Sequence, residues 1–435
     1  MKATSEPNSE LKNKMKTKLY NIKQGVGAFL IAFVIFLIVL LKGYTFSELN
    51  VVYVYTILIT TFMLSRIGGS FFYKSHSRNI DSHFEPTVTF IIPCKNEEKA
   101  IFHTIKKCFE VDYPKNKVEV IAINDGSTDN TLKEMLRIKE LYPTGDLHIA
   151  NWKQNKGKRE GMLYGFKTAK GEIVVQLDSD SFLDKHCLRY LIYPFKDPNI
   201  AAVVGHTDPA NKDENLITKM QTAYYFMSFR ALKAAESIFD MVFCCSGCCS
   251  AYRKSYVLPV LDEWNSETFM GKKIIYGDDR SLTNQMLKRG YKSVYVEEAQ
   301  AYTIVPNKLR QFLKQQVRWK KGWFINSLKA SRFVIKKDKF VSFTYFFPLI
   351  LLTLLTPFIA FKALVINPIF LNIFPYFYIL GIMLVTCLLY IHYTVYDGGK
   401  YGKYMFLWSI LNMTILSYIL IYALYDLKNL SWGTR

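Results

Sequence analysis

Apolar residues are concentrated in runs of membrane length near the two ends of the chain. Residues 26–41 and 51–67 are almost entirely apolar, and only a short loop separates them. An apolar run of about 20 residues is long enough to cross a bilayer as a helix. We therefore expect two transmembrane helices within residues 26–67. Because their connection is short, both outer ends of this hairpin lie on one side of the membrane.

The C-terminal apolar region predicts two more transmembrane helices within residues 340–392, over about 341–361 and 364–390. No Lys, Arg, Asp or Glu occurs between Lys362 and Asp397, so the connection between these helices suits the outer side. A last apolar stretch, 404–426, fits either another transmembrane helix or an interfacial or re-entrant helix. Hydropathy alone favours the transmembrane interpretation.

The region between these runs has the pattern of an α/β domain with a Rossmann-like sheet, which we place at residues 84–310. Short apolar runs rich in Val and Ile occupy 88–93, 118–124 and 172–177, and polar residues follow each of them. Such runs are typical of strands buried on both faces of a parallel sheet, where ligands bind beyond the carboxyl ends. Residues 311–339, which combine basic and aromatic positions, predict amphipathic helices at the membrane interface.

The formal net charge of +20 comes mainly from basic residues beside the apolar runs. Lysines fill a polar N-terminal tail, residues 1–25, and basic residues precede the third run at Lys329, Arg332, Lys336, Lys337 and Lys339. Basic residues next to spans mark the cytoplasmic side and suit anionic headgroups. This distribution predicts a lipid bilayer, and no nucleic acid, as the partner. It also predicts that the tail and the α/β domain are cytoplasmic.

Four of the eight cysteines form the sequence Cys244-Cys245-Ser246-Gly247-Cys248-Cys249. A zinc site requires a second pair of ligands at a suitable distance, and none is evident. Small buried thiols that line a tight loop are the favoured interpretation. The pattern does not indicate a disulfide framework, which fits a reducing cytoplasmic environment.

Carboxylates follow two of the predicted strands. Asp178-Ser179-Asp180 comes directly after the strand at 172–177, and such oxygens suit a hard cation such as Mg²⁺ or Mn²⁺ that also binds phosphates. Asp125 follows the strand at 118–124 and can accept a hydrogen bond from a nucleotide base. Pro93 and Glu97 would form the opposite wall of that pocket. The alternative for each motif is a turn or helix cap.

A second set of motifs predicts group transfer from a nucleotide diphosphate. Lys158 and Arg159 adjoin a helical stretch, where adjacent cations at a helix N-terminus bind phosphate, unless they are only part of a solvated turn. Asp279, in Gly277-Asp278-Asp279-Arg280, is our candidate general base, with a helix N-cap as the structural alternative. Arg318 suits a diphosphate leaving group and Trp319 a sugar ring, unless they belong only to an interfacial helix.

Taken together, these motifs resemble the processive, inverting, membrane-embedded family 2 glycosyltransferases of the hyaluronan, chitin and cellulose synthase group. The resemblance covers nearly the whole chain and rests on this ordered set: Asp125, Asp178-Ser179-Asp180, Gly277-Asp278-Asp279-Arg280, Gln315-x-x-Arg318-Trp319 and Trp432-Gly433-Thr434-Arg435. It implies a GT-A domain embedded in a transmembrane helical region, UDP-sugar donors, Mg²⁺ or Mn²⁺, and export of a growing polysaccharide through a channel formed by the spans. We expect a monomer in the plasma membrane.

The resemblance also implies roles for particular residues. Asp125 matches a uracil-binding residue, Asp180 a metal ligand and Asp279 the catalytic base. Further donor-binding residues are Pro93, Glu97, Lys158, Asp178, Arg318, Trp432 and Arg435, and acceptor-binding residues are Cys245, Asp278, Arg280, Gln315 and Trp319. The motif at 431–435 matches a gating motif that closes over the donor from the cytoplasm, which favours an interfacial or re-entrant helix at 404–426.

Several stretches are most similar to hyaluronan synthases, including Val204-Gly205-His206-Thr207 and Glu267-Thr268-Phe269-Met270-Gly271, although Cys248 stands where those enzymes usually carry Pro. The prediction is therefore hyaluronan made from UDP-N-acetylglucosamine and UDP-glucuronate. The alternatives are chitin or chitin oligosaccharides, a glucose–glucuronate capsule polymer and a lipid-linked single-sugar transferase. A transporter or scaffold with a degenerate transferase domain is the non-enzymatic alternative, against which the intact motifs argue.

Overall fold

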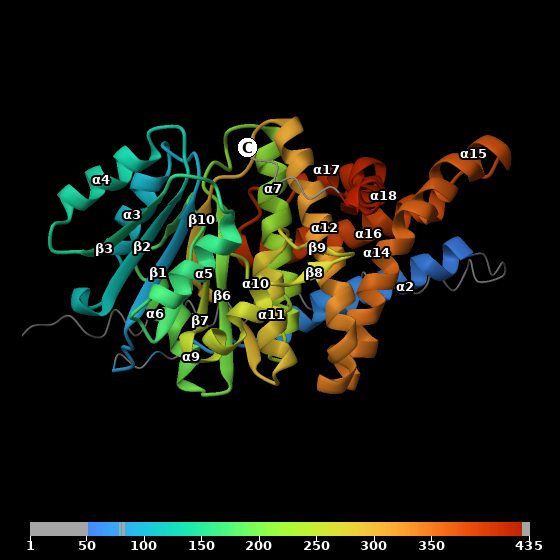
Figure 1. The fold of residues 1–435 in the computed structure, drawn as a ribbon. Coiled ribbons are helices and arrows are strands. Elements are labelled where there is room, and N and C mark those ends of the chain that lie inside the picture. The colour runs from blue at the N-terminus through green and yellow to red at the C-terminus, as the bar shows by residue number, and fades with distance from the viewer. Residues whose placement is uncertain (1–50, 78–79, 81–82, 429–435) are drawn as a thin grey trace, which may run out of the picture.

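The computed structural model describes residues 51–77, 80 and 83–428. In it, an α/β domain packs against a group of long apolar helices (Figure 1). The predicted N-terminal tail, the first predicted span and the 431–435 motif lie outside the described residues, so the expectations for them stay predictions.

An eight-stranded mixed sheet forms the centre of the α/β domain, in the order β3-β2-β1-β4-β7-β6-β10-β5. All strands run parallel except β7 and β5, which pair antiparallel with their neighbours. The bounds are β1 Val88–Cys94, β2 Val118–Asp125, β3 Asp146–Trp152, β4 Ile173–Gln176, β5 Ser181–Leu183, β6 Ile200–Pro209, β7 Ser250–Arg253 and β10 Lys292–Thr303. The sheet thus confirms the predicted α/β class.

Helices cover both faces of this sheet. Alternate residues of the central strand β1 point to opposite faces and therefore pack against different helices. Phe90 and Ile92 pack with α3 Ile101–Phe109, α4 Thr131–Leu141 and α6 Cys187–Ile192. Ile91, between them, packs on the other face with α5 Lys158–Thr168, α10 Leu261–Asn265 and α11 Asp278–Lys288. All seven residues of β1 are buried, as expected for a strand inside a two-sided core.

The pairing of β1 with both β2 and β4 brings three strand ends together. Cys94 lies opposite Asn124 of β2, and Ile91 lies opposite Gln176 of β4. The loops that follow these strands therefore meet at one edge of the sheet. This edge is where the predicted polar motifs gather.

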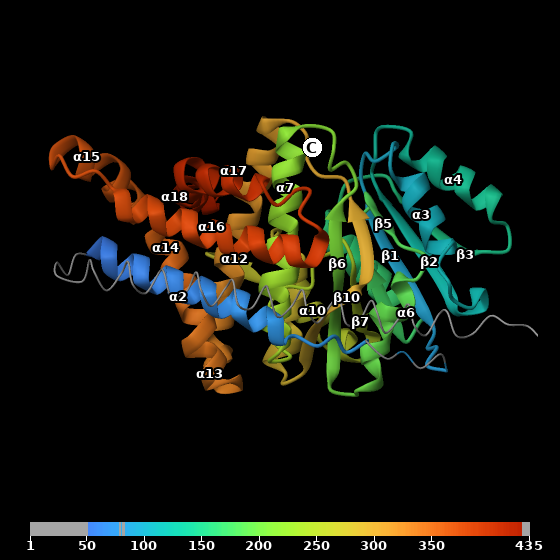
Figure 2. The ribbon, with the colours of Figure 1, turned by 180° about the vertical axis from the view of Figure 1, so that it is seen from behind.

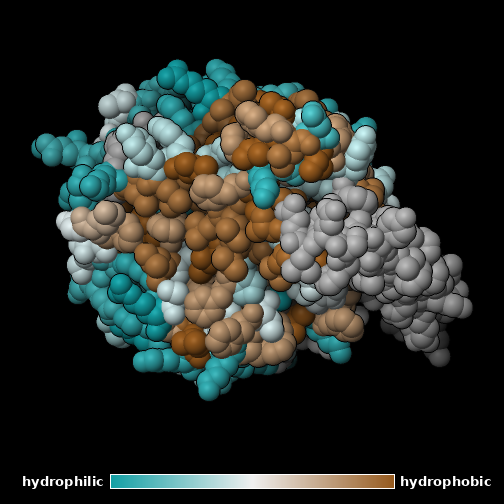
Figure 3. All heavy atoms as spheres, turned by 90° about the vertical axis from the view of Figure 1, so that its right-hand side faces the viewer, coloured by the Kyte–Doolittle hydropathy of each residue, from teal (hydrophilic) through white to brown (hydrophobic). Residues whose placement is uncertain are grey.

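Long apolar helices lie beyond the sheet, where Figures 1 and 2 show α2 and α16 side by side. Four helices among the described residues are long and apolar enough to cross a membrane: Val54–Phe72, Lys339–Phe370, Tyr378–Asp397 and Tyr404–Lys428. Figure 3 shows a broad hydrophobic surface at this end of the molecule. Large exposed side chains such as Phe343, Phe358 and Tyr376 contribute to such surface, which would be unfavourable in water and suits lipid.

The helical region is built from a few continuous stretches, whose bounds are: α2 Val51–Phe72, α12 Leu309–Lys337, α13 Lys339–Val341, η5 Ser342–Phe346, α14 Phe347–Phe361, η6 Lys362–Ile366, α15 Asn367–Phe370, α16 Tyr376–Asp397, α17 Tyr404–Leu411, η7 Asn412–Leu416, α18 Ser417–Tyr425 and η8 Asp426–Lys428. Smaller helices lie between the sheet and these stretches: α7 Leu216–Phe226, η3 Met227–Lys233 and α8 Ala234–Ser237. The short helix α9 Lys254–Val257 follows β7 within the α/β domain. The stretch at 311–339, expected to form several helices, is mostly the single helix α12.

One predicted boundary is wrong. We expected a break between two spans near Lys362, but the helix continues through this residue to Phe370. The break follows at residues 371–375, where Asn372 has a positive φ of 51° and Pro375 precedes the next helix. A single charge does not end a helix, and this helix even runs through Pro357, whereas a residue with a left-handed backbone does end it.

Both ends of the last apolar helix, 404–428, contact the α/β domain. Just before it, the Tyr401 hydroxyl donates a hydrogen bond to Asp213, which lies between β6 and α7, at 2.7 Å. At its other end, Lys272 Nζ of the short hairpin β8–β9 (Thr268–Phe269 and Lys272–Lys273) donates to the Lys428 carbonyl at 3.0 Å. The helix therefore begins and ends beside the same domain.

Candidate active site

Asp279, the second residue of α11, is held by two neutral donors at the edge of the sheet. Its Oδ1 accepts a hydrogen bond from Gln176 Nε2 at 2.7 Å, and its Oδ2 accepts from the Gly247 backbone N–H at 2.9 Å. The side chain remains 23% exposed. A carboxylate has further lone pairs, so this arrangement fixes the group while leaving it able to accept a proton.

Lys158, the first residue of α5, lies between two carboxylates. Its Nζ is 2.6 Å from Asp178 Oδ1 and 3.8 Å from Asp279 Oδ1. Burial acts to lower the pKa of Lys158, but the two carboxylates outweigh burial and raise this pKa above its ordinary value. Burial likewise acts to raise the pKa of Asp178, whereas Lys158 and Arg318 hold it below its ordinary value. Both groups are therefore charged at neutral pH.

Asp125 organises the loop that leads to Lys158. Its carboxylate accepts hydrogen bonds from the backbone N–H groups of Lys156, at 2.6 Å, and Gly157, at 2.9 Å. Gly157 has a φ of +95°, which glycine adopts without strain. The predicted base contact stays a prediction, and the structure adds that this buried carboxylate fixes the start of α5.

Pro93 and Glu97 lie at the end of β1, beside Asp125. Pro93 is buried under α5, where a Cβ on Gly161 would lie 3.0 Å from the proline ring. The Glu97 backbone N–H donates a hydrogen bond to Thr131 Oγ1 at 2.8 Å. These contacts give both residues a part in shaping the strand end, next to the predicted nucleotide pocket.

Asp180 is buried where β5 begins, and Thr303 Oγ1 of β10 lies 3.4 Å from its Oδ1. Across the described ranges, no group of three or more His, Cys, Asp or Glu side chains is arranged to hold a metal ion. Asp180 does supply a hard carboxylate oxygen. A cation such as Mg²⁺ commonly uses one or two carboxylates and completes its shell with phosphate oxygens and water, so the residues fit a site completed by substrate.

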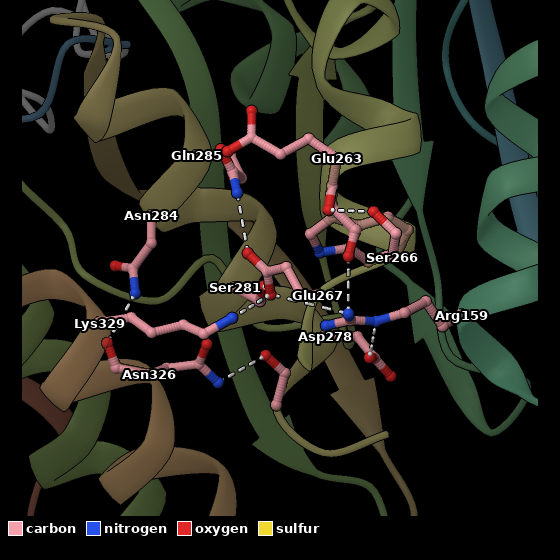
Figure 4. A network of polar contacts seen from close by, with 12 residues as sticks. Arg159, Glu263, Ser266, Glu267, Asp278, Ser281, Asn284, Gln285, Asn326 and Lys329 are labelled. Carbon is pink, nitrogen blue, oxygen red and sulfur yellow. Dashed lines mark hydrogen bonds and ion pairs between the residues drawn. The ribbon is translucent and has the colours of Figure 1, made fainter. Parts of the chain in front are cut away.

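Asp278 points into the protein and pairs with Arg159. Arg159 Nε donates to Asp278 Oδ1 at 2.8 Å, and both side chains are buried. Burial raises the pKa of Asp278 above its ordinary value, against the opposing effect of Arg159. Figure 4 shows this pair within a larger polar network. Asp278, which we expected to bind the acceptor, is therefore already paired with a buried cation.

The other predicted acceptor residues lie on two helices. Arg280 is partly buried and has no ion pair with any described residue. On α12, the Trp319 ring lies 6.4 Å from that of Tyr224, which stacks on Trp408 at 4.3 Å. Gln315 Oε1 is buried without a hydrogen-bond partner among the described residues. These groups offer an aromatic and polar surface next to the Asp279 helix.

We expected Cys245 to bind the acceptor, but it lies in the core beneath β7 and is fully buried. Its backbone N–H donates to Thr283 Oγ1 at 3.0 Å, and burial raises the pKa of its thiol to about 12. Cys248 lies closer to the predicted donor site, because its Sγ is 3.7 Å from Asp178 Oδ2. The structure therefore assigns Cys245 a packing role.

Two residues that contact the candidate base, Gln176 and Gly247, were not identified from the sequence, and Arg159 was expected to bind phosphate beside Lys158 instead of pairing with Asp278. Gln176 and Gly247 hold Asp279, and Arg159 holds its neighbour. Each is adjacent to a motif, since Gln176 precedes Asp178 by two positions, Gly247 interrupts the cysteine cluster and Arg159 follows Lys158. Proximity to a motif was the available signal, but it does not reveal which side chains meet.

Comparison with known proteins agrees with this geometry. Residues 89–261 match the family described as glycosyl transferase family 2. The chain is 28% identical over 412 residues to a hyaluronan synthase of Streptococcus pyogenes serotype M6, covering 93% of this chain and 95% of the relative. It is 30% identical over 260 residues to an N-acetylglucosaminyltransferase of Azorhizobium caulinodans, covering 59% of this chain and 65% of that protein.

The fold is also similar to that of a solved mannosyltransferase from Pyrobaculum calidifontis in complex with GDP-Man and Mn²⁺. The TM-score is 0.55 at 18% sequence identity, and the match covers 86% of this chain and 99% of the other. At this identity the likeness concerns the fold, which is of the GT-A type.

Proposed function

We propose that this glycosyltransferase, in which residues 89–261 match glycosyl transferase family 2 and four of the described helices are long and apolar enough to cross a membrane, polymerises UDP-sugars into a β-linked polysaccharide, hyaluronan, and exports it. The observation that carries the chemistry is Asp279, which is held by Gln176 and Gly247 and lies 3.8 Å from Lys158. A fixed, partly exposed carboxylate beside a cation suits proton abstraction next to a departing diphosphate.

In the proposed reaction, an acceptor hydroxyl attacks the anomeric carbon of the donor sugar. The hydroxyl proton passes to the Asp279 carboxylate, while the bond between the anomeric carbon and the diphosphate oxygen breaks and UDP leaves. This direct displacement inverts the anomeric configuration and requires no second carboxylate as nucleophile. Gln176 and Gly247 keep Asp279 in place during the transfer.

Positive charge stabilises the leaving group in this proposal. Lys158 Nζ lies 2.6 Å from Asp178 Oδ1, and Arg318 also acts to lower the pKa of Asp178, so we assign both cations to the diphosphate. Cations fixed in advance stabilise developing phosphate charge without reorganisation. We assign Asp180 to a Mg²⁺ or Mn²⁺ ion, which would neutralise the diphosphate when bound. Asp125, Pro93 and Glu97 would form the pocket for the base.

The membrane arrangement is part of the proposal. We place the α/β domain in the cytoplasm and the apolar helices in the plasma membrane as several passes, with Trp319 and Arg280 facing the growing chain. The contacts at both ends of the 404–428 helix, to Asp213 and from Lys272, support an interfacial or re-entrant helix. A helix that crossed the membrane completely would carry one end away from this domain.

Hyaluronan is proposed because similarity to the Streptococcus hyaluronan synthase extends over nearly the full length of both proteins. An enzyme that uses UDP-N-acetylglucosamine alone is the second candidate, supported by the partial similarity to an N-acetylglucosaminyltransferase.

The deciding experiment supplies purified protein and Mn²⁺ with UDP-N-acetylglucosamine, UDP-glucuronate or both. We expect polymer only from the pair, and its digestion by hyaluronidase. Chitinase-sensitive product from UDP-N-acetylglucosamine alone would replace hyaluronan by chitin. The matched control is Asp279→Asn, which we expect to lose at least about 100-fold in turnover while still binding UDP.

A further inference from the structure

Two adjacent cations at the start of α5 face two adjacent carboxylates at the start of α11. Lys158 Nζ lies 3.8 Å from Asp279 Oδ1, and Arg159 Nε lies 2.8 Å from Asp278 Oδ1. The second pair is the shorter of the two. The first turns of both helices are therefore joined at the point where the candidate base is located.

Arg159 is held in one orientation by several partners. Besides Asp278, its guanidinium donates through Nη1 to the Trp264 carbonyl at 2.8 Å. It also lies over the Trp264 ring, 4.6 Å from the centroid. Because the guanidinium is planar and its donors have a fixed geometry, these contacts together determine where Asp278 sits. A lysine at this position cannot make all of them at once.

Glu267 extends the arrangement to α12. Its Oε1 accepts from Gln285 Nε2 at 2.8 Å and its Oε2 accepts from Ser281 Oγ at 2.5 Å, both on α11. Lys329 Nζ of α12 lies 3.3 Å from Oε2, and Arg159 Nη1 lies 3.7 Å from it. Figure 4 shows Glu267 at the centre of these contacts. The network thus links α5, α11 and α12, the three helices that carry Lys158, Asp279 and Arg318.

We propose that Arg159 is a positioning residue, which acts through Asp278 to hold the Asp279 carboxylate in its catalytic place. The inference rests on the proposed function, in which Asp279 is the base. In this assignment neither Arg159 nor Asp278 touches substrate. Asp278 is the anionic anchor of the first turn of α11 instead of an acceptor contact.

A buried ion pair that served only folding would behave differently from a positioning pair. Charged groups that act on Asp278 include Arg159, Lys158 and Asp279. Titratable groups that interact with Asp279 are Lys158, Cys248 and Tyr252 as well as Asp278. Removing the Asp278 charge takes a negative group away from the base, so the acidic limb of the pH profile for kcat should move to lower pH. A pair that served only folding would change the amount of folded enzyme without moving this limb.

The experiment uses full-length protein and compares Arg159→Lys, Asp278→Asn and the control Asp262→Asn. Asp262 pairs with Lys167 between α5 and α10, but these side chains are 83% and 52% exposed. We expect Arg159→Lys to lower kcat about tenfold or more, with KM for the donor and the affinity for UDP within twofold of wild type. Asp278→Asn should shift the acidic limb to lower pH, and Asp262→Asn should match wild type.

Each outcome is decisive. A wild type that consumes no UDP-sugar contradicts the proposed function, whereas an active wild type allows the positioning role to be tested. An unchanged kcat in Arg159→Lys, together with an unmoved pH profile in Asp278→Asn, overturns that role. Equal losses of kcat and UDP affinity also overturn it. If Arg159→Lys does not fold, Asp278→Asn decides alone, because it keeps the side-chain size and an acceptor atom. If Asp278→Asn does not fold, the pair serves folding only.

Discussion

The backbone N–H of Gly247 donates a hydrogen bond to the carboxylate of Asp279 at 2.9 Å. This contact connects the cysteine-rich loop 244–249 to the candidate base, although the two residues are 32 positions apart in sequence. The same loop binds the other side of the site, because the Asp178 backbone N–H donates to the Gly247 carbonyl at 2.8 Å. One glycine therefore links the donor and acceptor motifs.

We predict that Gly247→Ala lowers kcat strongly without unfolding the protein. An added Cβ would lie 2.6 Å from Gln176 Nε2 and 2.9 Å from Asp178 Oδ1, so the groups around Asp279 would have to move. A displacement of about 1 Å costs on the order of 100-fold in rate. Turnover and UDP binding should be measured together. Gly68→Ala is the control, since nothing lies within 4 Å of its Cβ, and equal activity of both variants would contradict the prediction.

The Lys158–Asp178 pair predicts how the free energy of unfolding depends on pH. The pKa of Lys158 is raised, so its contribution is present below its unfolded pKa of about 10.4 and is lost as pH rises above this value. The pKa of Asp178 is lowered, so its contribution is present above about 3.9 and is lost as pH falls below this value. Between these two pH values, the contribution of the pair to the free energy of unfolding does not change with pH. Lys158→Met should therefore reduce the difference in stability between pH 7 and pH 3, measured by denaturant unfolding in detergent. If this difference in stability is the same in Lys158→Met as in the wild type, Lys158 does not lower the pKa of Asp178.

The Lys321–Asp426 pair predicts a stabilising link between α12 and the end of the last apolar helix. The two charged atoms are 2.6 Å apart, with Lys321 4% and Asp426 24% exposed. Asp426→Asn removes the carboxylate that lies 2.6 Å from this buried ammonium, and we expect the free energy of unfolding to fall by about 2–3 kcal/mol, below the full cost for a completely buried pair. Lys321→Met should cost less, because it removes the buried charge together with its desolvation penalty. Lys288→Met, which breaks an exposed pair with Glu263, serves as the control and should cost about 1 kcal/mol or less. If Asp426→Asn lowers the free energy of unfolding no more than this control does, the Lys321–Asp426 pair does not stabilise the protein.

The contacts at both ends of the 404–428 helix predict its membrane topology. Phe370 and Tyr425 are 73% and 88% exposed, so a cysteine at either position is accessible to reagents. In intact cells, an impermeant maleimide should label Phe370→Cys and should reach Tyr425→Cys only after permeabilisation. The wild type provides the background from the native cysteines. Labelling of Tyr425→Cys from outside would show that this helix crosses the membrane.

Local sequence patterns were sufficient to predict the main strands and the apolar helices. The Val- and Ile-rich runs predicted β1, β2 and β4, because strands buried on both faces require continuous apolar residues. The apolar runs likewise predicted the four candidate spans among the described residues, although they missed the break at 371–375. The ordered motifs indicated a resemblance to family 2 glycosyltransferases, and the match of residues 89–261 to that family agrees with this resemblance.

Long-range contacts decided what each predicted residue does. Local patterns were enough to predict the strand-end carboxylates, the basic residue that begins α5 and the candidate base Asp279. The packed fold was needed to show that Asp279 binds Gln176 and Gly247, that Asp278 turns inward to Arg159, and that Cys245 packs in the core. Hydrophobic periodicity can be read from neighbouring residues, whereas the partner of a side chain depends on how elements far apart in sequence pack together.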